Sequence, residues 1–341
     1  MNKLDIAQNS LDVSLDRVPH GGGTFTFSER VEFMKRYGRH SMAYSVMQPN
    51  MRYFDIEGKG YIAFRKQWGT AVCLGNPVCA KADRAELIDA FVAKHPDCVF
   101  IQVTPDVAQL IHERTGFYAT QFGKETIIDL KTWSLSGKKK QVIRTAVNHA
   151  EKEGVEIKER YGDTSYRQLS EHWLQTRKCK GREIVFLIRP MEMDFTEGTR
   201  RFFAYKDGKM IGFIFFDPVY ENGQVVGYVP NISRASEEFP AGIFYSIMSY
   251  AFEQFKAEGI PFVFLGLSPL ALDYPPLAME SKFLRWMLEK TAKYGNFLYN
   301  FKGIDFTKSR FRGEEEATYA VHKKALPSKA FLAMFRLCNV I

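Results

Sequence analysis

The sequence predicts an α/β protein, in the broad sense that includes α+β, whose mixed sheets are flanked by helices. Two observations support this fold class. Apolar strand-like runs alternate with amphipathic helical patterns, and both halves follow the same order of meander, helix, strand, helix and strand. The 341 residues suffice for two domains. We therefore expect a duplicated αβ unit with a site between its halves, and the alternative is a single large α/β domain.

The first half begins with a polar arm, residues 1–24, and continues as a first domain over 25–135. Its elements are predicted from hydrophobic periodicity and from turn residues, and Ser28 is the expected cap of the first helix. The predicted elements are a helix over 29–38, strands over 51–60 and 61–77, a helix over 81–95, a strand over 98–104, a helix over 106–115 and an extended segment over 117–130.

A basic connecting helix over 136–154 leads into the second domain, 155–325. The elements of this domain are a strand over 155–161, a helix over 165–178, a meander over 200–229, a helix over 241–259, a strand over 261–267, a helix over 281–294 and a strand over 296–301. The segment 298–311, LYNFKGIDFTKSRF, mixes aromatic and basic residues. We expect its aromatic rings to pack as a terminal strand and its cations to face an anionic substrate.

Charge and cysteine content narrow the possible function classes. The net charge of +8 favours an anionic partner such as nucleic acid, acidic lipid or phosphate. Five cysteines without a CxxC pair or a Cys/His cluster indicate free thiols in a reducing cytosol and no metal site. No stretch approaches the ~20 apolar residues that span a bilayer. We expect a cytoplasmic protein, at most peripheral to the inner face of the membrane.

Four stretches of the second half combine polar residues with the ends of predicted elements. They are a cationic helix end before Glu183, a strand end at Asn231 and Arg234, an irregular strand exit at Ser268, and the segment 298–311. Each alone has an ordinary structural explanation, such as a helix C-terminus or a βα loop. Common nucleotide-binding, metalloprotease and hydrolase signatures are missing, and the seven histidines are scattered.

Taken in order, HWLQTRKCKGREIVF, ISRASEEFPAGI, LGLSPL and YNFKGIDFTKSRF resemble consecutive signatures of the cytosolic domain of aminoacyl-phosphatidylglycerol synthases. These are the lysyl- and alanyl-transferases that modify bacterial lipids. LGNPV at 74–78 resembles that family's Gly-Asp-Pro-Val turn, and 142–154 resembles its basic inter-domain helix. The resemblance covers roughly residues 25–325 and concerns this domain without the membrane flippase that precedes it in full-length members. It implies two tandem acetyltransferase-like (GNAT) units.

The resemblance also implies roles for single residues. Glu183, Arg234 and Lys302 match residues of the family's motifs and are the candidate catalytic residues. The candidate substrate-binding residues are Trp173, Asn231, Ser268, Lys308, Arg310 and Arg312. A separate basic patch suits an RNA acceptor stem or simply solvent, and its residues are the candidate RNA-binding residues Lys138, Lys139, Lys140 and Arg144. Asn231 and Asn76 stand where the family usually has Asp. The loss of a carboxylate at 231 weakens the expectation that a cationic amino acid is recognised there.

The function that the resemblance implies is aminoacyl transfer from aminoacyl-tRNA to a hydroxyl or amine of a phosphatidylglycerol-like lipid. Aminoacyl-tRNA is then a co-substrate and no other cofactor is expected. Glu183 is the candidate base or amine-binding group, and Arg234 and Lys302 are candidates for holding phosphate. An acyl-CoA-dependent N-acyltransferase is the alternative, although the loop at 238–242 offers a single glycine. A non-catalytic lipid- or RNA-binding protein ranks third.

The last predicted segment is the apolar tail, 326–341. Pro327 and Ser328 can start a short helix there. We weigh two alternatives equally, a terminal helix docked on the core and an interfacial anchor that brings the enzyme to its lipid acceptor.

Overall fold

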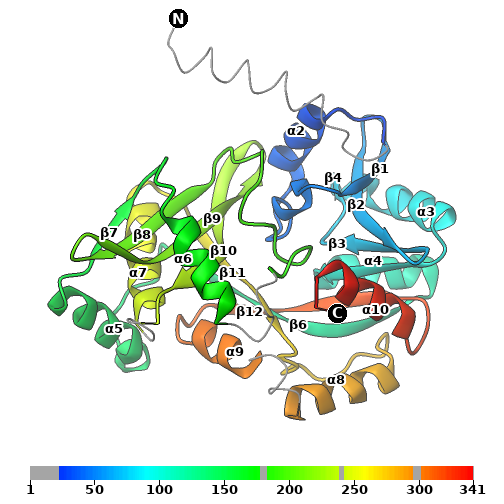
Figure 1. Ribbon diagram of the computed structural model, residues 1–341. Helices are drawn as coiled ribbons and strands as arrows, with labels where there is room; N and C mark the ends of the chain where they lie inside the picture. The colour runs from blue at the N-terminus through cyan, green and yellow to red at the C-terminus, as the bar shows by residue number, and fades with distance from the viewer. Residues whose placement is uncertain (1–22, 177–182, 238–241, 295–300, 341) are drawn as a thin grey trace, which may run out of the picture.

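The computed structural model describes residues 23–176, 183–237, 242–294 and 301–340. These residues form one mixed sheet of 12 strands with helices on both faces (Figure 1). The strands follow the order β1-β2-β3-β5-β12-β6-β11-β10-β9-β8-β7, and β4 pairs with β2. Their bounds are β1 Arg52–Ile56, β2 Gly60–Gln67, β3 Thr70–Leu74, β4 Val78–Cys79, β5 Cys98–Val103, β6 Tyr118–Asp129, β7 Glu156–Glu159, β8 Arg200–Lys206, β9 Lys209–Glu221, β10 Gln224–Ala235, β11 Phe262–Pro269 and β12 Glu314–His322.

Helices cover the sheet on its two sides, and none in the described ranges is long and apolar enough to cross a bilayer. Their bounds are α2 Phe27–Tyr37, α3 Arg84–Lys94, α4 Pro105–Thr115, α5 Gln141–Lys152, α6 Tyr166–Gln175, α7 Ile243–Ala257, α8 Lys282–Tyr294, α9 Phe301–Ser309 and α10 Ser328–Leu337, with short 3₁₀ turns η1 Ser45–Met47, η2 Lys81–Asp83 and η3 Lys138–Lys140.

The N-cap of the first helix lies two residues before the predicted cap. Thr26, not Ser28, is the N-cap of α2: its hydroxyl accepts from the Glu29 backbone N–H at 3.2 Å. The Glu29 carboxylate in turn accepts from the Thr26 backbone N–H at 2.6 Å. The prediction failed because Ser28 competes with an equally good cap two residues upstream that also has a Glu at the reciprocal position.

Strand β9 shows how the sequence builds the layers. Its alternating side chains enter different cores: Ile214 and Phe216 pack with residues of α7, whereas Phe213 and Phe215 pack with Tyr166 of α6. A strand that is buried on both faces requires an apolar run with little alternation, and the sequence of β9 has this character.

The C-terminal strand β12 lies in the middle of the sheet, between β5 and β6. It pairs antiparallel with both: Val321 lies opposite Phe100 of β5 and Ala119 of β6. Strand β6 then pairs antiparallel with β11 on its other side, with Val263 opposite Ile128. The sheet is therefore continuous from one half of the chain to the other.

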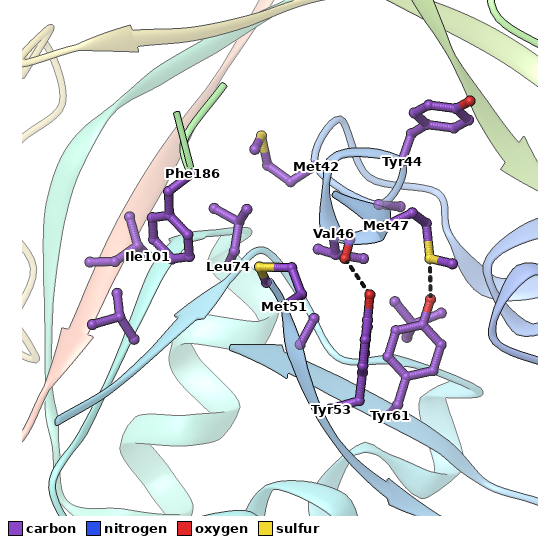
Figure 2. Packing of buried hydrophobic residues seen from close by; sticks show 14 of the residues in the cluster. Met42, Tyr44, Val46, Met47, Met51, Tyr53, Tyr61, Leu74, Ile101 and Phe186 are labelled. Carbon is purple, nitrogen blue, oxygen red and sulfur yellow. Dashed lines mark hydrogen bonds between the residues drawn. The ribbon is translucent and has the colours of Figure 1, made fainter. Parts of the chain in front are cut away.

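The core on one face of the first half also holds a residue from the second half (Figure 2). Tyr53 and Tyr61 are fully buried there, and the Tyr53 hydroxyl donates to the Val46 carbonyl at 2.8 Å. Phe186 enters the same cluster beside Leu74 and Ile101. Because Phe186 is completely buried, the segment that follows Glu183 is fixed to the first half of the molecule.

The predicted terminal strand is wrong. Residues Phe301–Ser309 form the helix α9, and the rest of the strand predicted over 296–301 lies outside the described residues. Ile304, Lys308 and Phe311 repeat at helical spacing, and only Phe311 of the described aromatic side chains in this stretch is fully buried. The mixed aromatic and basic composition reflected a half-exposed helix rather than a pleated strand.

The tail forms α10, which docks on the first half of the sheet. Ala330, Ala333, Met334 and Cys338 belong to the same core cluster as Tyr53. The first of the two alternatives, a terminal helix packed on the core, describes this segment, although Leu332 and Phe335 remain 49% and 40% exposed.

Candidate functional site

Three predicted site residues from separate segments meet beside β10. The Arg234 Nη2 atom lies 3.4 Å from the Glu183 Oε1 atom, and the guanidinium carbon lies 4.0 Å from the centre of the Trp173 ring. Arg234 is on β10, Trp173 is on α6, and Glu183 opens the segment that Phe186 fixes. We call these three residues the Glu183 cluster.

The carboxylate of Glu183 is held in place by its neighbours. Its Oε1 atom accepts from the Met191 backbone N–H at 3.3 Å, and its backbone carbonyl accepts from the Asn339 side chain at 3.2 Å. Burial raises the pKa of Glu183, and the positive charge of Arg234 opposes that rise. A side chain that is 25% exposed keeps a route to a ligand. The cluster therefore combines a carboxylate of increased basicity with a guanidinium that rests on an indole face.

A second group of charged residues, which the sequence analysis missed, is more deeply buried than the Glu183 cluster. The Arg189 guanidinium binds the Asp217 carboxylate with three contacts of 2.6–2.9 Å, and their side chains are only 3% and 1% exposed. The Asn231 side-chain amide donates to Asp217 at 2.5 Å and to the Ser45 hydroxyl at 3.1 Å. Asp217 interrupts an apolar run in β9, and that interruption was the available signal.

The two asparagines that replace the family's usual Asp have structural partners. Asn231 acts as a donor toward a carboxylate, a role that an ionised Asp cannot fill. Asn76 both donates to the Thr104 hydroxyl at 2.9 Å and accepts from the Thr104 backbone N–H at 3.0 Å. Asn231 therefore belongs to the buried Arg189–Asp217 network.

The strands β10 and β11 separate next to this network. They pair in parallel at Gly227 with Phe262 and at Tyr228 with Val263, and each then continues without further pairing to the other. Beyond this point β11 is irregular: Gly266 has a φ of +71°, and the register with β6 shifts between Phe264 and Leu267. Such an irregularity turns backbone groups of β11 away from the ladder.

The side chain of Lys308 contacts the irregular part of β11. Its Nζ atom donates to the carbonyls of Gly266 at 3.0 Å and Leu267 at 2.8 Å. Burial lowers the pKa of Lys308 to about 8, and the carboxylate of Glu125 opposes that change. Burial raises the pKa of Glu125 on β6 to about 7. The Oε1 atom of Glu125 and the Ser268 hydroxyl are both buried without a hydrogen-bond partner among the described residues.

The other predicted cations of the second half take different places. Lys302 is exposed on α9 and donates to the Lys293 carbonyl of α8 at 3.4 Å. The Arg310 guanidinium lies 3.7 Å from the centre of the Phe306 ring. Arg312 lines a pocket of about 370 Å³ together with Thr126, Tyr274, Ser309, Gly313 and Glu315. Lys302 was expected on a strand and lies on a helix instead.

The predicted RNA-binding residues form the start of α5 and the turn before it. Lys140 donates to the Ser134 carbonyl at 2.8 Å and lies over the Trp133 ring, and Arg144 donates to the carbonyls of Leu135 and Gly137 at 2.7 and 2.6 Å. Lys138 and Lys139 are exposed. Two of the four cations thus hold the preceding loop, and two face solvent.

Comparison with known proteins assigns the chain to a family. Residues 31–322 match the family described as phosphatidylglycerol lysyltransferase, C-terminal. The chain belongs to this family. It is 24% identical over 286 residues to the phosphatidylglycerol lysyltransferase of Bacillus subtilis, a match that covers 80% of this chain and 32% of that protein. It is 24% identical over 314 residues to the phosphatidylglycerol lysyltransferase of Staphylococcus aureus, with coverage of 86% and 35%.

The chain thus spans about a third of the length of these curated relatives. Among solved structures it resembles L-PGS from Bacillus licheniformis, with a TM-score of 0.75, 21% identity and coverage of 92% of this chain and 96% of that one. This likeness shows the fold, and it confirms the predicted α/β class with a mixed sheet flanked by helices. It also confirms the resemblance that the motifs indicated.

Proposed function

We propose that this chain transfers an aminoacyl group from aminoacyl-tRNA to a hydroxyl or amine of a phosphatidylglycerol-like lipid. The observation that carries the proposal is the Glu183 cluster, in which a partly buried carboxylate, a guanidinium and an indole ring meet beside β10. Family membership supports the reaction class, because curated relatives in the match are named phosphatidylglycerol lysyltransferases.

The reaction requires an acceptor to lose a proton while it attacks an ester carbonyl. A bond forms between the acceptor oxygen and the carbonyl carbon, the bond from that carbon to the tRNA ribose oxygen breaks, and the acceptor proton ends on the ribose oxygen. Glu183 suits the transfer of that proton because burial raises its pKa, which makes its carboxylate a stronger base. Direct transfer needs no covalent intermediate on the protein.

Several cations of the chain suit the negative charge of both substrates. The positive charge of Arg234 opposes the rise in the pKa of Glu183, and a guanidinium suits a phosphate or a developing oxyanion. Lys308 adds an ammonium group where β11 is irregular, and Lys302 adds one on the exposed surface of α9. The exposed Lys138 and Lys139 fit the phosphates of an RNA acceptor stem, and such contacts predict binding that weakens steeply with salt.

The test is aminoacyl transfer by purified protein supplied with a panel of charged tRNAs and phosphatidylglycerol vesicles, with products identified by mass spectrometry. We expect Glu183→Gln to lower kcat by about 10²–10⁴-fold, the usual contribution of a general base. Arg234→Ala and Lys302→Ala are expected to lower transfer with little change in melting temperature. Glu192→Gln, which removes an exposed carboxylate paired with Arg167, is the matched control.

Four results would contradict parts of this proposal. A fully active Glu183→Gln variant would assign the base to another group. Unchanged turnover in Lys302→Ala would remove its phosphate contact. Saturable acyl-CoA binding without any response to aminoacyl-tRNA would favour the N-acyltransferase alternative, and binding of lipid or RNA without product would favour a non-catalytic protein.

A further inference from the structure

Helix α8 presents large apolar side chains to solvent. Phe283, Trp286, Met287 and Tyr294 are 51%, 54%, 37% and 61% exposed. The rings of Phe283 and Trp286 stack with centres 6.1 Å apart, so they form one surface rather than isolated side chains. Figure 1 shows α8 at the lower edge of the molecule, outside β6. An exposed aromatic surface of this kind indicates an interaction site.

The opposite side of α8 is fixed firmly, which rules out a simple rotation that would bury these rings. Leu284 and Leu288 are buried, and Arg285 is only 5% exposed. The Arg285 guanidinium donates to the Gln121 side chain at 2.8 Å and to the carbonyls of Leu272 and Tyr274 at 3.0 and 2.9 Å. The aromatic face is therefore held outward by contacts to β6 and to the preceding loop.

Two further exposed leucines extend the apolar face at the start of α8. The Ser281 hydroxyl donates to the Ala325 carbonyl at 2.6 Å and accepts from the Leu284 backbone N–H at 3.3 Å. This link brings residue Leu326, 41% exposed, to the beginning of the helix. Leu277, 48% exposed, precedes the helix and donates its backbone N–H to Glu280.

Lysines border this apolar face. Lys282, Lys290 and Lys293 are exposed on α8, with the ammonium groups of the last two 5.9 and 5.2 Å from the ring centres of Trp286 and Tyr294. Lys323 and Lys324 are exposed next to Leu326 in the chain. The acidic residue of α8, Glu289, has its carboxylate 2.8 Å from Arg285. The border of the surface is thus strongly positive.

We propose that this surface, which we call the α8 face, docks on an anionic lipid bilayer. Aromatic and aliphatic side chains at the centre can enter the headgroup region, and the surrounding lysines can contact lipid phosphates. The inference rests on the proposed function in that it supplies the contact with the lipid acceptor. It assigns docking to α8 instead of the C-terminal tail.

Helix α10 offers a weaker surface of the same type. Leu332 and Phe335 are exposed, and Trp68 lies in the β2–β3 turn, whose Gly69 approaches Lys329 of α10. Lys329 is bound to Asp97 at 2.7 Å, so its charge is already partly neutralised. Charge complementarity with an anionic bilayer therefore favours α8.

The experiment is flotation of the full chain with vesicles of phosphatidylglycerol and phosphatidylcholine, compared with phosphatidylcholine alone. We expect the double variant F283A/W286A to raise Kd for the anionic vesicles at least about tenfold, because two large apolar groups are lost. The variant K282E/K290E/K293E should reduce binding by roughly a hundredfold or more. W68A is the matched control, since Trp68 and Trp286 are both 54% exposed, and it should stay within about twofold of the wild type.

The outcomes separate this inference from the proposed function. Wild-type binding to anionic vesicles that is lost in the α8 variants, at unchanged melting temperature, supports the surface even if no aminoacyl lipid is formed. Transfer to phosphatidylglycerol in detergent micelles should persist in F283A/W286A, because micelles do not require docking. The inference is overturned if the α8 variants bind as the wild type does, if W68A or L332A/F335A lose binding instead, or if the wild type does not bind.

Discussion

Two buried charge pairs each contain a carboxylate from the sheet, Asp217 of β9 and Glu125 of β6, and they differ in how completely they are hydrogen-bonded. Arg189 and Asp217 form a bidentate pair to which Asn231 adds a further donor. Glu125 and Lys308 influence each other's ionisation, yet Glu125 keeps one oxygen without a partner among the described residues. The pKa of Arg189 is raised because the charge and hydrogen bonds of Asp217 outweigh the effect of burial, whereas burial moves both members of the second pair toward neutrality. Complete hydrogen bonding thus separates a structural pair from one that titrates near physiological pH.

Breaking the Arg189–Asp217 pair should produce the largest loss of stability. Asp217→Ala leaves the Arg189 guanidinium buried without its carboxylate, which typically costs about 3–5 kcal/mol in the free energy of unfolding. Urea denaturation followed by circular dichroism measures the loss. The double variant R189M/D217L should recover most of it, because no charge then remains buried. A loss below about 1 kcal/mol in Asp217→Ala would show that the pair contributes little.

The ionisation of Glu125 and Lys308 should produce a minimum in the pH dependence of stability. Between its ordinary pKa of 4.5 and the folded pKa of about 7, Glu125 binds its proton more tightly in the folded state, so stability falls as pH rises through this window. The fall is on the order of 3 kcal/mol. Between about 8 and 10.5 the unfolded state binds the Lys308 proton more tightly, so stability rises with pH.

Two single variants test this pH dependence. Glu125→Gln should flatten the acidic limb, and Lys308→Met should flatten the alkaline limb, in melting temperatures recorded from pH 4.5 to 10.5. Each is compared with the wild type at the same pH so that the titration of other groups cancels. Identical pH profiles in wild type and Glu125→Gln would show that this carboxyl titrates normally.

The smallest expected loss of stability concerns Asn231, which donates to the Asp217 carboxylate of the Arg189–Asp217 pair. Asn231→Asp replaces a donor by a second carboxylate beside Asp217, and we expect a loss of about 1–2 kcal/mol at pH 7 that diminishes on acidification as one carboxyl binds a proton. Asn76→Asp is the control, since an Asp there can still accept from the Thr104 backbone N–H. Equal losses in both variants would separate Asn231 from the Asp217 network.

Sequence patterns predicted much of the element order, and motif resemblance brought Glu183, Arg234 and Trp173 together before the structure did. These predictions failed for residues whose role depends on partners that are distant in the sequence. Arg189 and Asp217 are separated in sequence and make sense only as a buried pair, and the role of Glu125 depends on the neighbours of β6. The helix α9 was mistaken for a strand because a short, aromatic segment has no long apolar period.

The central position of β12 has a consequence for biosynthesis. Strands β5 and β6 are synthesised long before β12, the strand that joins them. Until then both present open edges that invite pairing with other chains. Contacts of such long sequence separation also slow folding. A nascent chain must therefore protect two unfinished strand edges until β12 has been made, and a premature stop before Glu314 leaves them permanently exposed.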